Sequence, residues 1–325
     1  MSLSPTRRLL HRTAVFTAVL ALLPIVLGAL VTTKGAGMAF RDWPTSDGQG
    51  MLAYGWLAST GDKFLEHGHR LAGMLIGLAS IGLAGVAIAA RANGGEKRTS
   101  VLVLSLLVLT GVVMQGLLGG ARVLMDQRGL AFIHGSFAAL VFCLMVSLAV
   151  VTSQGWELAR RSAAVSPIMI LLPRAAVVVV FLQYMLGGMV RHRGMHLNEH
   201  LAFAVLASVL VLASAVFAFR SALPWLRTPA TVLCLLLAIQ LVLGLATWVT
   251  KLGQGAGAWV AWLGLDGYTP VAGSALQTTM RTGHVIGGMF LLATTVVLAL
   301  RVGRLSGTET YAVSPATPQL AGGAA

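Results

Sequence analysis

Residues 66–90 read EHGHRLAGMLIGLASIGLAGVAIAA, and this stretch decides the fold class. Its apolar part, residues 71–90, carries no charge and is long enough to cross a bilayer, which takes about 20 apolar residues in one helix. An acid, two histidines and an arginine stand directly before it, at Glu66, His67, His69 and Arg70. The stretch predicts a membrane helix with polar chemistry at one end.

The composition extends this prediction to the whole chain. Of 325 residues, 57% are hydrophobic and 10% are charged, against about 25% charged residues in soluble proteins. The net charge of +13 comes from Lys and Arg scattered singly or in pairs at the ends of apolar runs. That scatter excludes a nucleic-acid surface, which needs clustered basic residues. The sequence therefore predicts an integral membrane protein whose surroundings are the lipid bilayer.

Apolar runs of membrane-spanning length predict eight helices, at residues 14–33, 67–90, 101–121, 129–152, 167–190, 197–219, 229–250 and 282–301. The first run, Ala14–Val31, is too long for a signal peptide. An even number of spans places both termini on one side. A modest excess of Lys and Arg on that side predicts that both termini are cytoplasmic, with the chain in the cell (inner) membrane.

An internal repeat divides the chain. Related phrases end the odd-numbered helices, namely PIVLGALVT at residue 24, QGLLGGARV at 115, QYMLGGMVR at 183 and QLVLGLATWV at 240. Each is followed by a returning helix with a histidine near its start. We therefore expect an all-α polytopic protein of two pseudo-symmetric four-helix bundles. The predicted parts are an N-terminal segment 1–13, halves 14–152 and 167–301, a linker 153–166 and a disordered tail 302–325.

The four recurring histidines, His69, His134, His200 and His284, are the candidate metal ligands. Ionisable residues in membrane helices are costly and mark functional sites. Two imidazoles on facing helices can hold a haem iron from both sides. We expect one pair in each half, His69 with His134 and His200 with His284. A zinc or copper site through His196 and His200 is the alternative.

Other polar residues lie beside these histidines. Glu66 precedes His69 by three residues and can handle a proton next to a haem pocket. Arginine pairs well with carboxylates, so Arg70, Arg122, Arg191 and Arg193 are candidates for the haem propionates. His67 points to a different helix face from His69 and is expected to be a bystander. Cys143 and Cys234 lie within apolar runs and form no CxxC motif, so they are expected to be small buried residues.

Several phrases together resemble the haem A synthases, a family of cytochrome oxidase assembly proteins. They are GAGMAFRDWPTSDGQG at residues 35–50, EHGHRLAGMLIG at 66–77, QGLLGGARV followed by LAFIHGS at 130–136, and TGHVIGG at 282–288. Part of the family carries a cysteine pair in the outer loops. Those loops hold no cysteine here, which excludes a thiol-based role.

The resemblance implies a function and a set of ligands. It implies eight membrane helices in two similar halves, and oxidation of the C8 methyl group of haem O to a formyl group, giving haem A. It implies a haem b cofactor on His200 and His284, substrate haem near His69 and His134, and a catalytic Glu66. Candidate protein partners are a haem O synthase, oxidase assembly factors and a second copy of the chain.

Three other functions compete with this one. A dihaem cytochrome b or quinone oxidoreductase subunit needs the histidine pairs but not Glu66. A haem chaperone binds haem without converting it. A transporter is disfavoured, because its polar groups belong near the bilayer midplane and here they gather at one membrane edge.

Overall fold

The computed structural model describes residues 3–253, 257–265 and 267–307. Within those ranges the chain is all-α and forms no β-strand. The helices are α1 Pro5–Leu20, α2 Leu22–Lys34, α3 Gly61–Ala92, α4 Thr99–Met125, α5 Arg128–Val151, α6 Gln154–Leu158, α7 Pro167–Arg193, α8 Leu197–Arg220, α9 Pro224–Leu252, α10 Trp259–Trp262 and α11 Ala275–Leu305, with a 3₁₀ turn at Trp56–Ala58.

In the described part of the chain, eight helices are long and apolar enough to cross a membrane, as predicted. The first of them, Pro5–Lys34, combines α1 and α2. The break between these two falls at Ala21 because Pro24 has no N–H to donate to Leu20, and its ring crowds that carbonyl.

Several helices begin earlier than the apolar pattern predicts, and for α3 and α11 the difference bears on the site. Helix α3 starts at Gly61 rather than at 67, so Glu66 lies within the helix. Helix α11 starts at Ala275 rather than at 282. The hydroxyl of Ser274 caps the start of this helix by accepting from the N–H of Gln277. Helix α11 also continues to Leu305. Residues 302–305 of the predicted tail are therefore helical, and residues 308–325 lie outside the described ranges.

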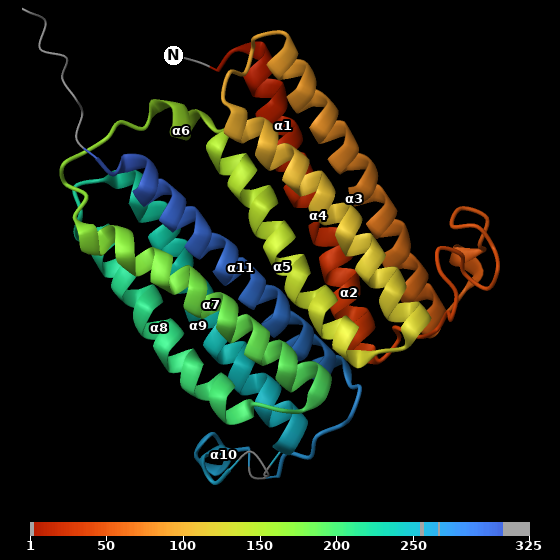
Figure 1. Ribbon diagram of the computed structural model, residues 1–325. Coiled ribbons are helices and arrows are strands. Elements are labelled where there is room, and N and C mark those ends of the chain that lie inside the picture. Colours follow the sequence, from red (N-terminus) through yellow and green to blue (C-terminus); the bar gives the residue numbers. More distant parts are fainter. Residues whose placement is uncertain (1–2, 254–256, 266, 308–325) are drawn as a thin grey trace, which may run out of the picture.

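The long helices pack in two groups that lie side by side in Figure 1. Helices α1 to α5 form one group, and α7, α8, α9 and α11 form the other. Contacts of α11 with α2 and α5, and of α5 with α7, join the groups. The internal pseudo-symmetry stays a prediction.

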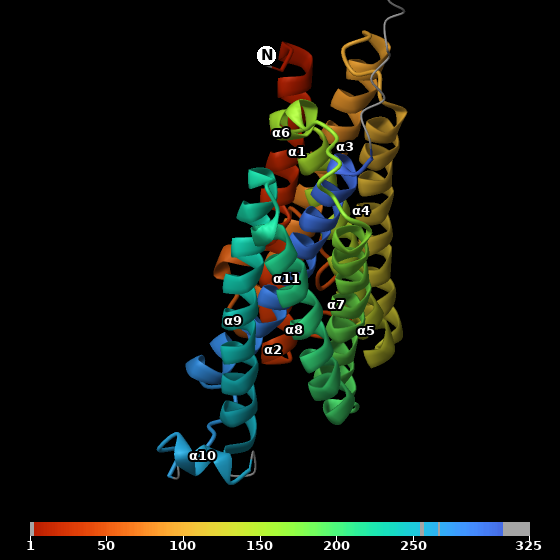
Figure 2. The ribbon, with the colours of Figure 1, turned by 90° about the vertical axis from the view of Figure 1, so that its left-hand side faces the viewer.

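The two ends of the molecule differ. The start of α1 and the end of α11 lie at one end, which we call the terminal end (Figure 1). The opposite end carries residues 35–60 and the described residues 257–265 and 267–274, which include α10 beyond the end of α9 (Figure 2). We call this the histidine end, because the four recurring histidines lie near it.

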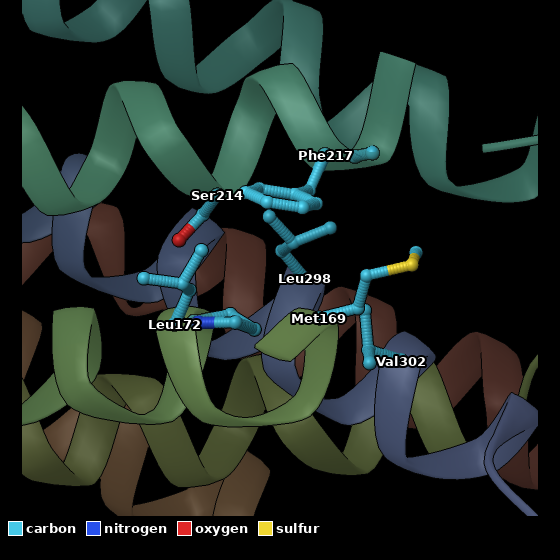
Figure 3. Close-up of a pocket in the computed structure, with 8 residues that line it drawn as sticks. Met169, Leu172, Ser214, Phe217, Leu298 and Val302 are labelled. Atoms are coloured by element: carbon cyan, nitrogen blue, oxygen red, sulfur yellow. The ribbon is translucent and has the colours of Figure 1, made fainter. Parts of the chain in front are cut away.

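A small apolar hollow lies between α7, α8 and α11 (Figure 3). Met169, Ser214, Phe217, Leu298 and Val302 are among the residues that line it. Its empty space of about 200 Å³ is partly open to the surroundings and leaves no room for a water molecule. These residues lie near the terminal end, far along each helix from the histidines, so the hollow is a packing feature and not a ligand site.

Candidate functional site

Two histidine pairs of equal geometry lie at the histidine end. His69 on α3 and His134 on α5 have ring centres 6.3 Å apart at an interplanar angle of 84°. His200 on α8 and His284 on α11 have ring centres 6.3 Å apart at 86°. The structure thus brings together the residues that the sequence analysis paired, with one pair inside each helix group.

Each histidine ring packs against a glycine on the preceding membrane helix. A β-carbon added to that glycine would lie 2.8–3.1 Å from the nearest ring atom, Cε1. The pairs are Gly28 with His69, Gly119 with His134, Gly187 with His200, and Gly244 with His284. These glycines come from the repeated phrases of the sequence. Their role as supports for the histidines was missed, although the shared spacing was visible.

The residue four positions before each glycine also faces the histidine. His69 Nδ1 lies 3.0 Å from the carbonyl oxygen of Pro24. Nδ1 of His284 lies 2.9 Å from the side-chain Nε2 of Gln240, and Nδ1 of His134 and of His200 has no hydrogen-bond partner among the described residues. A carbonyl that accepts from Nδ1–H leaves Nε2 free for a metal.

Two glutamine side chains add a second contact. Nε2 of Gln115 donates to the backbone oxygen of His134 at 2.9 Å. Nε2 of Gln240 donates to the backbone oxygen of His284 at 2.9 Å. These bonds tie each histidine-bearing helix to its neighbour and fix where the ring enters the bundle.

The pairs fit a haem iron better than a metal held by protein ligands alone. Within the described residues, no cluster of three or more His, Cys, Asp or Glu side chains could hold a metal ion. Metal–imidazole bonds of about 2.0–2.1 Å, with about 1.1 Å from nitrogen to ring centre, put two imidazoles on opposite sides of one iron roughly 6 to 6.5 Å apart. Both pairs have this spacing, and a porphyrin supplies the four remaining ligands.

His196, the alternative ligand, lies elsewhere. It precedes α8 with a left-handed backbone (φ 67°). Its Nδ1 is 3.3 Å from the carboxylate of Glu199, and its side chain is 38% exposed. His200 instead faces Gly187 and His284. The geometry therefore favours His200 over His196 and gives no support to a zinc or copper site through both.

Glu66 and Arg70 form a buried ion pair, with Oε1 and Nη2 2.7 Å apart. The other Glu66 oxygen, Oε2, accepts from the N–H groups of Ala39 at 2.7 Å and Phe40 at 3.3 Å. Nη1 of Arg70 donates to the carbonyls of Asp42 at 2.8 Å and Thr45 at 2.6 Å. Both side chains therefore hold residues 36–54, which we call the strap.

His67 is not the bystander that its position on the helix predicted. It is fully buried beneath the strap. Nδ1 lies 2.9 Å from Ser46 Oγ, and Nε2 lies 3.1 Å from the carbonyl of Met51. The spacing of His67 from His69 did not predict these contacts, because they are made to the strap, whose position does not follow from the helix pattern.

Among the candidate propionate arginines, Arg70 differs from the other three because both of its terminal nitrogens are bonded within the protein. The guanidinium of Arg70 is already bonded to Glu66 and to the strap. Arg122 packs against Gly37 of the strap, and Arg193 packs near Gly129 at the start of α5. Nη2 of Arg191 donates to Ala29 O at 2.7 Å and to Thr33 Oγ1 at 2.8 Å, which links α7 to α2. Arg122, Arg191 and Arg193 remain candidates near the histidine pairs.

Comparisons with known proteins find two similarities, each over part of the chain. Residues 56–199 match the model of a family described as cytochrome oxidase assembly protein. That segment contains Glu66, His69 and His134. A relative named heme A synthase, from Shouchella clausii (strain KSM-K16), is 30% identical over 141 residues. The alignment covers 43% of this chain and 44% of the relative, so less than half of each is matched. Over less than half of its length, the chain is thus similar to cytochrome oxidase assembly proteins and to a heme A synthase.

Proposed function

We propose that this chain oxidises the C8 methyl group of haem O to a formyl group, giving haem A for terminal oxidase assembly. His69 and His134 bind the substrate haem, and His200 and His284 hold a haem b cofactor. The observation that carries the proposal is the presence of two histidine pairs of equal spacing. An enzyme that oxidises one haem with the help of another needs two such sites.

The overall chemistry sets what the site must handle. When water supplies the oxygen, conversion of CH₃ to CHO consumes one water and releases four protons and four electrons, and the electrons must pass to an external oxidant. The carbon passes through a hydroxymethyl and a hydrated aldehyde, which loses water. A bound haem b supplies a one-electron redox centre. The protons leave through side chains near the substrate pair, among which Glu66 is the nearest carboxylate in the sequence.

The residues then take distinct roles. His69 and His134 orient the porphyrin, and Arg122, Arg191 and Arg193 meet propionates. The strap and Arg70 hold the Glu66 carboxylate in place, and Oε1, which accepts only the Arg70 bond, can still accept a proton. Arg70 holds Glu66 and the strap and is not assigned to a propionate.

The eight membrane helices and the excess of basic residues at the terminal end support a location in the cell (inner) membrane with both termini cytoplasmic. A haem O synthase is the partner that supplies the substrate. Oxidase assembly factors are the partners that receive the product, and a second copy of the chain is a further candidate partner.

The test is haem extraction and mass analysis from membranes. The chain is co-expressed with a haem O synthase in a host that makes no haem A. Haem A in these membranes, absent without the chain, supports the enzyme. Bound haem b with no haem A contradicts it and favours the dihaem cytochrome. Bound haem O that remains unconverted also contradicts it and favours the chaperone.

A further inference from the structure

The surroundings of His67 are those of a built contact. The ring is fully buried and lies 4.6 Å from the ring of Tyr54 and 6.1 Å from that of Phe40, centre to centre. A neutral imidazole with its proton on Nε2 satisfies both polar neighbours. It donates to the carbonyl of Met51 and accepts from the hydroxyl of Ser46.

His67 is the buried anchor of the second half of the strap. Glu66 binds residues 39 and 40, and Arg70 binds residues 42 and 45. His67 binds residues 46 and 51. The ion pair of Lys63 with Asp47 also reaches this half, but both of its side chains are exposed. Loss of His67 therefore leaves the second half of the strap without a buried polar anchor on α3.

The strap in turn borders the first histidine pair. The Trp43 ring packs on Gly120, which follows Gly119, the glycine that supports His134. Gly37 packs against the guanidinium of Arg122, a candidate propionate partner. The position of the strap therefore sets the position of groups around the His69 and His134 pair.

We propose that His67 is a positioning residue for the haem held by His69 and His134. It fixes the strap, and the strap places Glu66 and Arg122 beside that haem. The inference rests on the proposed function, because it assigns the strap to the substrate pair. It implies that changes at His67 affect the first pair and leave the second pair, His200 and His284, unaffected.

The test compares His67→Leu, which keeps the ring's apolar packing but removes both hydrogen bonds, with Ser46→Ala, which removes one. His11→Leu is the matched control, since His11 lies near the terminal end and bonds to Thr152. The first measurement is hydrogen exchange of the strap peptide. Two neutral hydrogen bonds are worth about 1 kcal/mol each, so we expect exchange roughly ten- to thirty-fold faster in His67→Leu and a smaller increase in Ser46→Ala.

The second measurement is the ratio of haem A to haem O, with haem b in the second pair followed by its spectrum. We expect the ratio of haem A to haem O to fall in His67→Leu and to recover in part when the supply of haem O rises. The haem b spectrum should stay unchanged. A faster-exchanging strap with an unchanged ratio overturns the proposal. So does a strap that remains protected in His67→Leu.

The two proposals fail in different ways. If the unaltered chain makes no haem A, the proposed function fails. The positioning role is then tested by titrating haem b into membranes that contain the unaltered chain or His67→Leu. Membranes with His69→Ala, which removes a ligand of the first pair, give the level of binding without that site. Weaker binding at the first pair in His67→Leu supports it, and unchanged binding overturns it.

Discussion

Each of four glycines faces a histidine ring across a helix contact, so the absence of a methyl group decides whether the ring fits. The added β-carbon of Gly244 would lie 2.9 Å from Cε1 of His284. That is closer than carbon atoms normally pack, so either the ring or the helix must shift. Glycine at these positions therefore serves the neighbouring helix more than its own, at a cost of about 1 kcal/mol relative to alanine in helix stability.

We predict that Gly244→Ala displaces His284 and lowers haem b content. Overpacking of this kind costs about 1–3 kcal/mol, enough to weaken an axial bond. The measurement is the low-spin haem spectrum and the haem-to-protein ratio after purification. Gly283→Ala is the control, because its β-carbon would meet Leu243 at an ordinary 3.5 Å. Equal haem content in both variants would contradict the role of Gly244.

A second residue-scale prediction concerns Glu66→Gln. A glutamine oxygen still accepts from Ala39 and Phe40, but its NH₂ then faces the guanidinium of Arg70, and a charge-assisted bond worth about 1.5–3 kcal/mol is lost. We expect haem b to remain and haem A to fall. Comparison with His67→Leu separates the two roles of Glu66. A larger loss of haem A at equal strap exchange indicates proton handling, and an equal loss indicates anchoring. Normal haem A from Glu66→Gln contradicts both.

At the scale of the element, the strap is an irregular segment stabilised by side chains rather than by a helix or sheet. Its own turn is built around Asp42, whose carboxylate accepts from the Thr45 hydroxyl at 2.6 Å and from the N–H groups of Gly48 at 2.8 Å and Asp47 at 3.1 Å. Partial burial raises the pKa of Asp42, but these hydrogen bonds outweigh it and hold the pKa below its ordinary value.

The lowered pKa gives the strap a defined pH response. The Asp42 carboxylate contributes stability above its unfolded pKa of about 3.9 and loses it as the pH falls through the lower folded value. We therefore predict the contribution of Asp42, measured as the difference in strap protection between the unaltered chain and Asp42→Asn after correction for intrinsic exchange. This difference should be constant from pH 5 to 8 and should fall only below about pH 4. Asp62→Asn, an exposed change in the first turn of α3, should not reduce protection at neutral pH. A change of the difference near pH 6 would contradict the role of the Asp42 carboxylate.

At the scale of the whole molecule, polar contacts tie the two helix groups together at the histidine end. Arg191 on α7 donates to Ala29 and Thr33 on α2. The hydroxyl of Thr33 also lies 3.1 Å from that of Thr282 on α11. The two histidine pairs are therefore held in one framework rather than in two independent bundles.

We predict that Arg191→Leu uncouples the two groups. Loss of two charge-assisted bonds removes about 3–6 kcal/mol at most, and the first and second pairs should then lose their haems at separate temperatures on heating. The measurement is haem absorbance during thermal denaturation. Arg220→Leu, an exposed change at the terminal end of α8, should keep a single transition. A single transition in Arg191→Leu would mean that the remaining contacts between the groups couple them without Arg191.

The sequence predicts the parts of this molecule that depend on local pattern. Eight apolar runs give eight helices, and the recurrence of glycine, glutamine and histidine identifies the four ring positions. It does not predict the strap, because His67, Ser46 and Met51 meet through a segment with no periodicity. It also places the start of α3 too late, since the polar turn at Asp62 and Lys63 continues the helix beyond the apolar run.

The repeated contact between a glycine and the histidine of the next helix has an evolutionary consequence. Each copy of the repeat is a two-helix hairpin that carries one complete histidine support, yet each pair takes its two rings from two hairpins. A single hairpin is therefore half of a site. An ancestral gene that encoded one hairpin could coordinate an iron from both sides only after self-association, and later duplications would have joined the copies into one polypeptide.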